Sequence, residues 1–371
     1  MKVPFIDLTV QYENIKPAID KAIQLVLQEG TYVGGEQVKK FERNFSKFYR
    51  VPHCVGVGNA TDGLFLALKA LGVGQGDEVI TPAWSWISSA EVISLVGAKP
   101  VFAEVAPDFY TVTEHFIREK ITRKTKAVIV VHLYGQAAEM TSIKRLCKRK
   151  GLFLIEDCSQ SHLSAEGKVK TGTTGDCGVF SFYPTKNLGA FGDAGCIVTN
   201  NPTLAKAIRR LANHGGLTKD EHLVEGTNSR LDTLQAAILK AKLPHLKDWT
   251  RRRIKNAKIY SNHLSGIKEV TLPKVRKNTL HTFHLFVILA EQRNRLKKFL
   301  QRNGVQTLIH YPKALPFEPP YRYLKHTKRD FPVSSRLQNS VLSLPIYPEL
   351  TEGQISYVCD LIKSFYGYEK N

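Results

Sequence analysis

The sequence predicts an α/β fold, a mostly parallel seven-stranded sheet flanked by helices, followed by a smaller α+β domain at the C-terminal end. Three observations support this prediction. Short β-branched runs alternate with helical patterns from about residue 50 to about residue 200. The length of 371 residues suits roughly two or three domains. After about Thr250 the alternation stops, so we expect a large domain with an N-terminal arm over residues 1–249 and a small domain over residues 250–371, joined by a long helix.

Seven runs in the first part have the length and composition of buried strands. In chain order they are His53–Val57, Glu78–Pro82, Pro100–Glu104, Ala127–His132, Leu152–Asp157, Gly178–Phe182 and Gly195–Thr199. Between them, residues such as Leu64, Leu68 and Leu71 recur at the spacing of one helix face. Because helical patterns separate successive strands, crossover connections and parallel pairing are favoured.

The C-terminal part has a different order of elements. We expect a strand at Thr282–Ala290, a helix near Gln292–Arg302 and a second strand around Val305–His310. A loop rich in Pro and Tyr, Tyr311–Tyr323, then leads to a closing helix near Thr351–Phe365. Strands and helices that follow one another without regular alternation are typical of an α+β domain.

Charge is the unusual feature of the composition. Lys and Arg number 53 and Asp and Glu 33, which gives a formal net charge of +20. Such a charge attracts anions of many kinds, including nucleic acid, anionic lipid, nucleotides and phosphorylated small molecules. The basic segment Lys240–Tyr260 makes nucleic-acid binding an alternative, but it has no helix-turn-helix, zinc-finger or RNA-binding signature, so we expect no nucleic-acid partner.

The sequence also favours a cytoplasmic location without a membrane partner. The N-terminus has no apolar signal-peptide core. The longest apolar runs, such as Ala127–Val131 and Leu285–Ala290, are far shorter than the ~20 residues that cross a bilayer. The six cysteines lack the paired spacing of metal sites, so we expect free thiols and no metal.

Three motifs directly follow predicted strands, where ligands of open α/β sheets bind. The turn Gly58–Gly63 enters a helix and could hold a phosphate, although such turns are as often only tight connections. Within Glu156–Gln160, Asp157 could face a protonated ring nitrogen or cap a helix. Ser181–Gly189 contains Lys186, which could be a Schiff-base nucleophile, although most lysines are solvated surface groups.

Together these three motifs could hold pyridoxal 5'-phosphate (PLP). A dinucleotide site is not favoured, because the turn Gly58–Gly63 lacks the G-x-G-x-x-G pattern.

With these motifs in place, the chain resembles the DegT/StrS family of PLP-dependent nucleotide-sugar aminotransferases over essentially its full length. The matching blocks are Phe5–Leu8, Gly30–Gly35, Val38–Glu42, Gly58–Asp62, Val131–Gly135, Glu156–Asp157, Tyr183–Gly189, Gly192–Gly195 and Asn228–Asp232. The resemblance implies the PLP-dependent transferase type I fold. It also implies a homodimer with shared active sites.

Four residues would handle the cofactor ring if the resemblance holds. Lys186 would attach to the cofactor's aldehyde and serve as general acid and base. Asp157 would pair with the pyridinium nitrogen, and Gln160 would donate to the phenolate oxygen. Trp86 would stack on the ring, with Trp84 as its local competitor. Members of the family with histidine at the lysine position are dehydratases, so Lys186 indicates an aminotransferase.

The phosphate of the cofactor would be held from two subunits. The resemblance implies contacts from the Thr61 and Asp62 amides, from the Ser181 hydroxyl and from Asn228 of a second subunit. An ordinary loop cap is the alternative for Asn228. Sharing of this kind makes a dimer obligatory for activity.

Among family members, the chain is most similar to enzymes that aminate carbon 3 of dTDP-3-keto-6-deoxyhexoses. Tyr183, His310 and Tyr311 are the candidate hexose contacts, with plain packing as the alternative. Lys219 could meet the diphosphate, or be a solvated lysine. The donor would be L-glutamate, with pyridoxamine phosphate (PMP) between the half-reactions, in deoxyamino-sugar biosynthesis for a surface polysaccharide or natural product. A 4-keto-sugar aminotransferase and a PLP-binding regulator are the alternatives.

Overall fold

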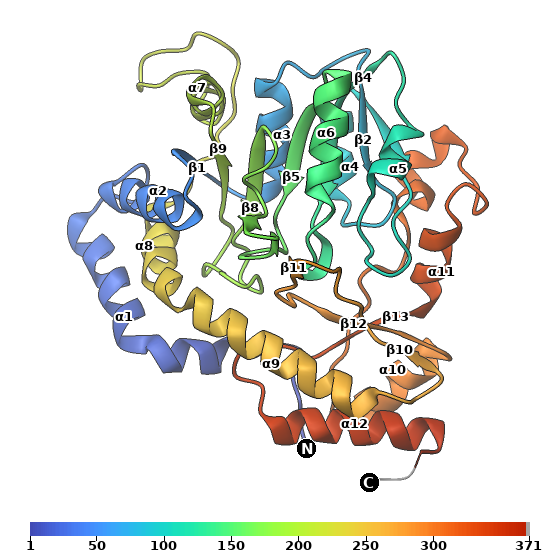
Figure 1. Cartoon of the computed structure of the whole chain (residues 1–371). Coiled ribbons are helices and arrows are strands. Elements are labelled where there is room, and N and C mark those ends of the chain that lie inside the picture. The colour runs from blue at the N-terminus through green and yellow to red at the C-terminus, as the bar shows by residue number, and fades with distance from the viewer. Residues whose placement is uncertain (369–371) are drawn as a thin grey trace.

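Seven strands form the main sheet of the computed structural model, which describes residues 1–368 (Figure 1). In sheet order they are β1 (His53–Val57), β9 (Gly195–Thr199), β8 (Cys177–Ser181), β5 (Phe153–Asp157), β4 (Thr125–Val131), β2 (Glu78–Pro82) and β3 (Lys99–Ala103). The strands from β8 to β3 pair in parallel, and β9 pairs antiparallel with both β8 and β1. The predicted mostly parallel seven-stranded sheet is confirmed, and the bounds of each of its seven predicted strands lie within two residues of the observed ones.

Helices flank the sheet, so its central strands are buried on both faces. β2, β8 and β9 have no exposed residue, as expected of strands that lie between two layers. The helices between the strands are α3 (Ala60–Ala70), α4 (Ser88–Leu95), α5 (Glu114–Arg118) and α6 (Met140–Lys150), with a 3-10 turn η1 (Leu133–Gly135), and α7 (Pro202–Leu211) follows the last strand of this sheet. α3 begins where the Asn59 side chain accepts a hydrogen bond from the Asp62 amide, and it buries Leu64 and Leu68.

The N-terminal arm packs on one side of the sheet, at the left of Figure 1. It consists of α1 (Leu8–Glu29) and α2 (Glu36–Tyr49), which pack against α8 (Thr233–Lys242). Phe41 and Phe45 of α2 meet Phe180 and Phe182 edge to face, with ring centroids 5.2–5.4 Å apart. Because β8 contains Phe180 and leads into the loop of Lys186, this aromatic cluster fixes the base of that loop.

The C-terminal part has its own sheet and core. Its elements are α9 (Leu246–Leu264), β10 (Val270–Thr271), β12 (Phe286–Ala290), α10 (Arg293–Arg302), α11 (Pro332–Ser340), β13 (Val341–Leu344) and α12 (Glu352–Tyr366), with 3-10 turns η2 (Leu243–His245), η3 (Leu315–Phe317) and η4 (Pro319–Leu324). A small sheet of β11 (Thr279–Leu280), β6 (Ala165–Glu166) and β7 (Val169–Lys170) links it to the large part. Tyr260, Phe286 and Ile355 lie in a second apolar core, to which Val3 also belongs. The division at residues 249 and 250 stays a proposal.

Two strands predicted in this part need correction. The strand expected at Thr282–Ala290 begins only at Phe286, because residues 282–285 bond to the large part instead. The strand expected around Val305–His310 is wrong. This segment makes only isolated bridges, Val305 to Val3 and Leu308 to Ser343, because its hydrogen bonds alternate between the N-terminal segment and β13 and form no continuous ladder.

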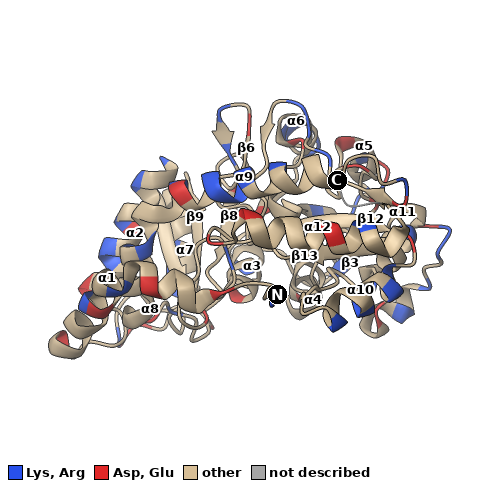
Figure 2. Cartoon of the chain, turned by 90° about the horizontal axis from the view of Figure 1, so that it is seen from below, with Lys and Arg blue, Asp and Glu red and all other residues tan. Residues whose placement is uncertain are grey.

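Basic residues are spread over the surface. Figure 2 shows Lys and Arg along α1, α2, α9 and α10, with Asp and Glu among them. On α9, Asp248 pairs with Arg251 and Arg252, and Lys255 pairs with Glu352. No helix within residues 1–368 has the length and apolar character needed to span a membrane. All six cysteines are buried free thiols.

Candidate active site

The candidate site lies at one edge of the main sheet. β1, β8, β5 and β4 run in the same direction, so their C-terminal ends meet at that edge. Three motifs singled out in the sequence follow these ends: the turn after β1, Asp157 at the end of β5, and the Lys186 loop after β8. The topology therefore brings to one edge three motifs that are far apart in the sequence.

The Lys186 loop is tightly fixed, but the amine of Lys186 is free. The Lys186 amide donates to the Tyr183 carbonyl at 2.8 Å. A side chain at Gly189 would come within 2.2 Å of the Pro184 carbonyl oxygen, so the turn requires glycine there. Burial lowers the pKa of Lys186 to about 8, although the Asp157 carboxylate opposes this shift. Within residues 1–368 the amine has no hydrogen bond or ion pair, so it is available as a nucleophile and a base.

Asp157 is almost buried, with 7% of its surface exposed. Its Oδ1 accepts a hydrogen bond from the Ser159 amide at 2.9 Å. Across the described part of the chain, nothing donates to its Oδ2. A carboxylate in this position lacks a donor, and the protonated nitrogen of a pyridine ring would supply one.

The aromatic residues at this edge divide into buried and open. Trp84 is fully buried, and its Nε1 donates to the Tyr134 hydroxyl at 2.8 Å. Trp86 is 59% exposed, and its ring lies 5.7 Å from the Tyr311 ring. Of the two tryptophans that compete in the sequence, only Trp86 therefore has a free face on which a ring can stack.

Gln160 makes contacts that the sequence did not indicate. Its Oε1 accepts from the Tyr134 amide, and its Nε2 donates to the Tyr311 hydroxyl, both at 2.8 Å. The Nε2 carries a second hydrogen, so the expected contact with a phenolate oxygen stays a prediction. Burial raises the pKa of Tyr311, which keeps its hydroxyl protonated. Gln160 thus connects Tyr311, a candidate hexose contact, to the edge of the main sheet that carries Asp157 and Lys186.

The turn after β1 offers free amides at the start of α3. The Asp62 amide already donates to Asn59 Oδ1 at 2.8 Å, and the Thr61 hydroxyl shares a hydrogen bond with Ser88. The backbone amides of Ala60 and Thr61 have no acceptor among residues 1–368. The helix start could hold a phosphate through these two amides, whereas the Asp62 amide would first have to leave Asn59.

Two further phosphate candidates stand in different surroundings. The Ser181 hydroxyl accepts from the Tyr183 amide at 3.3 Å. Asn228 is exposed and bridges to Asn213 in its own chain, so its expected contact with a second subunit stays a prediction. Its neighbour Ser229, which sequence reasoning missed, bonds to the turn itself: it accepts from the Gly58 amide at 3.1 Å and lies 2.8 Å from Asp62 Oδ2.

The remaining substrate candidates are only partly brought together. Tyr183 is 52% exposed on the Lys186 loop. His310 Nδ1 shares a hydrogen bond with the Ser343 hydroxyl at 2.8 Å, and its carbonyl accepts from the Tyr134 hydroxyl. Burial, together with the charge of Lys186, lowers the pKa of His310 to about 4. Lys219 lies in an exposed loop with no hydrogen bond or ion pair to the other candidates.

Glu156 is a fully buried carboxylate beside Asp157. Its oxygens accept from His132 Nε2 at 2.9 Å and from the Gly172, Thr174 and Gly175 amides at 2.7–2.8 Å. His132, Glu156 and Cys158 have ligand atoms within 4.8 Å of one another, a spacing that a metal could use. The four hydrogen bonds already satisfy the carboxylate, so Glu156 is a structural anchor.

The donor set at this edge fits PLP. A free amine on Lys186, a carboxylate oxygen of Asp157 without a donor, an open aromatic face on Trp86 and two free amides at the start of α3 are the groups that the cofactor's aldehyde, ring nitrogen, ring face and phosphate require.

Known proteins resemble this chain over nearly its whole length. The model of the DegT/DnrJ/EryC1/StrS aminotransferase family matches residues 13–363. A dTDP-3-amino-3,4,6-trideoxy-alpha-D-glucose transaminase from Streptomyces venezuelae is 39% identical over 364 residues, which cover 98% of this chain and 96% of that protein. The structure of DesV from S. venezuelae in complex with a ketimine intermediate superimposes with a TM-score of 0.97 at 38% identity, covering 100% of both chains.

Other similar proteins carry different names. A pleiotropic regulatory protein from Geobacillus stearothermophilus is 40% identical over 368 residues, 99% of each chain. Further relatives at 34–39% identity are named for UDP- and GDP-linked sugars. A structure from Bacillus subtilis with bound PMP has a TM-score of 0.87 and 28% identity, and covers 97% of this chain and 85% of that one. Family and fold therefore agree among these proteins, while the named sugar nucleotides differ.

Proposed function

Because the chain belongs to the DegT/DnrJ/EryC1/StrS aminotransferase family, we propose that this PLP-dependent sugar aminotransferase aminates carbon 3 of a dTDP-linked 3-keto-6-deoxyhexose, with L-glutamate as the amino donor. The observation that carries the proposal is the free Lys186 amine beside Asp157, at the same edge as Trp86 and Tyr311. The names of two dTDP-3-amino-sugar transaminases, 39% and 40% identical, support the choice of carbon 3. The product would enter a deoxyamino-sugar pathway.

In this proposal each residue of the edge has one task. PLP supplies the electron sink that lets a proton leave the donor's carbon. Lys186 attaches the cofactor and then moves that proton as general base and general acid, since its lowered pKa makes both forms accessible near neutral pH. Asp157 Oδ2 would keep the proton on the ring nitrogen, and Trp86 would cover the ring face. The Thr61 amide and the Ser181 hydroxyl would hold the phosphate, and the Asp62 amide would join them once it leaves Asn59.

The proposal also assigns the residues that contact the substrate. Tyr183, His310 and Tyr311 contact the hexose, and Lys219 meets the diphosphate. Asn228 reaches the phosphate of a second subunit, so the active unit is a homodimer with shared sites. The net charge of +20 suits a substrate that carries a diphosphate, although it selects no particular nucleotide.

Mass spectrometry of a substrate panel tests the proposal. The full-length protein, loaded with PLP, is given L-glutamate and 3-keto or 4-keto sugars linked to dTDP, UDP or GDP. We expect conversion of the 3-keto dTDP sugars to amines, with release of 2-oxoglutarate. Conversion of 4-keto sugars alone would overturn the assignment to carbon 3 and support the 4-keto alternative, and a preference for UDP or GDP sugars would overturn dTDP.

A regulatory role is the second candidate, and the name of the G. stearothermophilus relative is what favours it. A regulator would bind PLP without turning over a keto-sugar. Release of 2-oxoglutarate that depends on a keto-sugar would contradict this role. Duplex DNA retained at physiological salt would support it, whereas binding lost by about 0.2 M salt would be nonspecific attraction to a basic protein.

A further inference from the structure

His284 of the C-terminal part contacts the Lys186 loop of the large part. Its Nδ1 lies 3.1 Å from Oδ1 of Asn187, the residue that follows Lys186. Asn187 is only 3% exposed, so its side chain is committed to this contact and does not reach solvent. The two residues are 97 positions apart in the sequence, and the fold alone brings them together.

The neighbouring contacts fix the direction of this hydrogen bond. Asn187 Nδ2 points to the Thr282 carbonyl at 3.5 Å, so Oδ1 faces His284 and Nδ1–H is the donor. Burial lowers the pKa of His284. The charges of Lys186 and Arg253, and to a smaller extent those of His310 and His162, act in the same direction. A neutral imidazole has a single N–H, so the contact with Asn187 occupies it.

The segment that carries His284 is attached to the cofactor edge. The Thr282 amide donates to the Gly135 carbonyl at 3.0 Å, and the Leu285 amide donates to the Tyr134 carbonyl at 3.3 Å. The approach is close, since a side chain at Gly135 would lie 2.9 Å from the Phe283 amide nitrogen. Phe283 has a φ of 45°, a conformation that a bulky residue keeps only where its surroundings enforce it. The segment therefore has one defined position against the large part.

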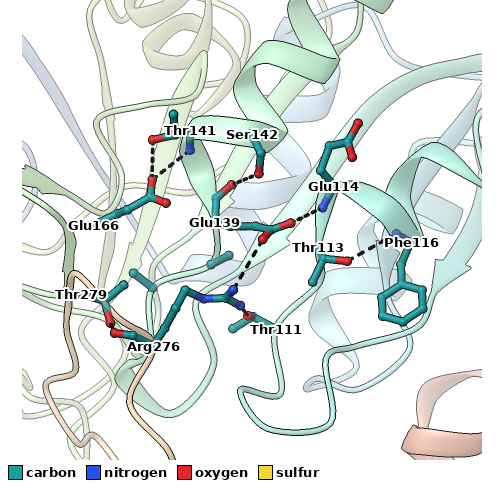
Figure 3. A network of polar contacts seen from close by, with 12 residues as sticks. Thr111, Thr113, Glu114, Phe116, Glu139, Thr141, Ser142, Glu166, Arg276 and Thr279 are labelled. Carbon is teal, nitrogen blue, oxygen red and sulfur yellow. Dashed lines mark hydrogen bonds and ion pairs between the residues drawn. The ribbon is translucent and has the colours of Figure 1, made fainter.

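A second attachment lies farther back along the same segment (Figure 3). Arg276 pairs with Glu139 at 3.5 Å, donates to the Thr111 hydroxyl at 3.1 Å and lies over the Phe109 ring. Its backbone amide donates to Gln136 Oε1 at 3.2 Å. None of these contacts involves the Lys186 loop. Arg276 thus holds the two parts of the chain together without touching the lysine, which makes it a control for His284.

We propose that His284 is a positioning residue for Lys186: its Nδ1–H holds the Asn187 side chain and so sets the place of the lysine relative to the C-terminal part. The proposal rests on the proposed function, in which Lys186 is the reactive amine. It means that the C-terminal part, which presents His310 and Tyr311 to the substrate, also determines where the lysine stands.

Two replacements of His284 separate positioning from packing. The amide nitrogen of asparagine can take the place of Nδ1, whereas that of glutamine reaches the place of Nε2. We expect His284→Asn to keep the contact with Asn187 and His284→Gln to lose it. The first readout is amide hydrogen exchange of peptides covering residues 183–190 in the full-length protein, and the second is the kcat and KM of the half-reaction with L-glutamate.

For His284→Gln we expect exchange in residues 183–190 to rise about tenfold and kcat to fall about tenfold, since one buried hydrogen bond is lost. We expect KM for glutamate to stay within about twofold, and His284→Asn to restore both quantities to within about threefold. Arg276→Gln should lower the melting temperature and leave residues 183–190 unchanged. The proposal is overturned if His284→Gln matches the wild type in exchange, or if Arg276→Gln has the same effect as His284→Gln. Failure of the proposed function would show differently, as PLP binding and turnover that survive Lys186→Ala.

Discussion

Glu156 and Asp157 are neighbours at the end of β5, yet their surroundings are opposite. Glu156 is wholly buried and accepts four hydrogen bonds, while Asp157 is 7% exposed and accepts one. Successive residues of a strand face opposite sides of the sheet, which explains how they come to differ. Burial alone would raise the pKa of Glu156, but His132 and the backbone amides outweigh it and lower the pKa. The number of bonded oxygens therefore separates the structural acid from the one left open to a ligand.

Two lysines repeat this comparison. Burial lowers the pKa of both Lys186 and Lys242 to about 8, against the opposing charges of Asp157 and Glu349 respectively. The amine of Lys242 donates to the Gly189 carbonyl at 2.6 Å, whereas that of Lys186 has no partner within residues 1–368. A lowered pKa therefore does not distinguish the structural Lys242 from Lys186. Of the two amines, only that of Lys186 is free to react.

Replacing these two lysines gives the largest expected difference. Lys186→Ala should lower the rate of amino transfer by about 10³-fold or more, because both the nucleophile and the proton carrier are lost. Lys242→Met should keep most of the activity and lower the melting temperature, because the Gly189 carbonyl loses its donor. Steady-state rates and thermal unfolding of both variants measure this. Comparable activities in the two variants would contradict the comparison.

Asp157→Asn should have the next largest effect. The amide preserves the shape of the side chain but removes the negative charge that holds a proton on the cofactor's ring nitrogen, so we expect kcat to fall by about 10²-fold. The melting temperature should change little, since the oxygen of the substituted amide can still accept from the Ser159 amide. Kinetics with saturating PLP test this. An unchanged kcat would remove Asp157 from the cofactor site.

Glu156→Gln should lower the stability of the fold and change the catalytic rate little. The new amide group turns one acceptor into a donor that faces backbone N–H groups, so we expect a loss of about 2–4 kcal/mol in the free energy of unfolding. The kcat of the folded fraction should stay within about threefold of wild type. Urea unfolding, together with activity corrected for the folded fraction, checks both. A large loss of kcat without loss of stability would reverse the roles of the two acids.

The sequence predicted what depends on local pattern and on strand ends. The seven strands were predicted because buried strands appear as apolar runs, and Lys186 and Asp157 were singled out because they lie at or after the ends of such runs. The roles of these two residues stay predictions. The bonded state of Glu156 could not be predicted, since its donors come from His132 and from amides of a later loop. The same holds for the strand wrongly expected at residues 305–310, whose partner Val3 lies near the other end of the chain.

The two tryptophans extend the comparison to smaller effects. Trp86→Leu should weaken PLP binding by roughly fivefold, because stacking contributes about 1 kcal/mol beyond the buried area. Trp84→Phe should leave PLP affinity within about twofold and lower stability, because the Tyr134 hydroxyl loses the indole donor. Titration of the protein freed of cofactor measures both affinities. Equal losses of affinity would mean that the exposed Trp86 face is not the stacking surface.

The pH dependence of Lys186 gives the finest test. A folded pKa of about 8, below the ordinary 10.5, means that PLP uptake should rise with pH through 8 and then level off. The neutral fraction of Lys186 grows about tenfold between pH 7 and pH 9.

The same pKa shift affects stability. Between pH 8 and 10.5 the unfolded chain holds a proton that the folded chain has lost, so the free energy of unfolding falls as pH falls through this window and is constant below it. Lys242 contributes the same stability term, but only Lys186 controls uptake. Asp157→Asn should therefore move the midpoint of uptake below pH 8 by removing the opposing carboxylate, while Lys242→Met leaves it in place.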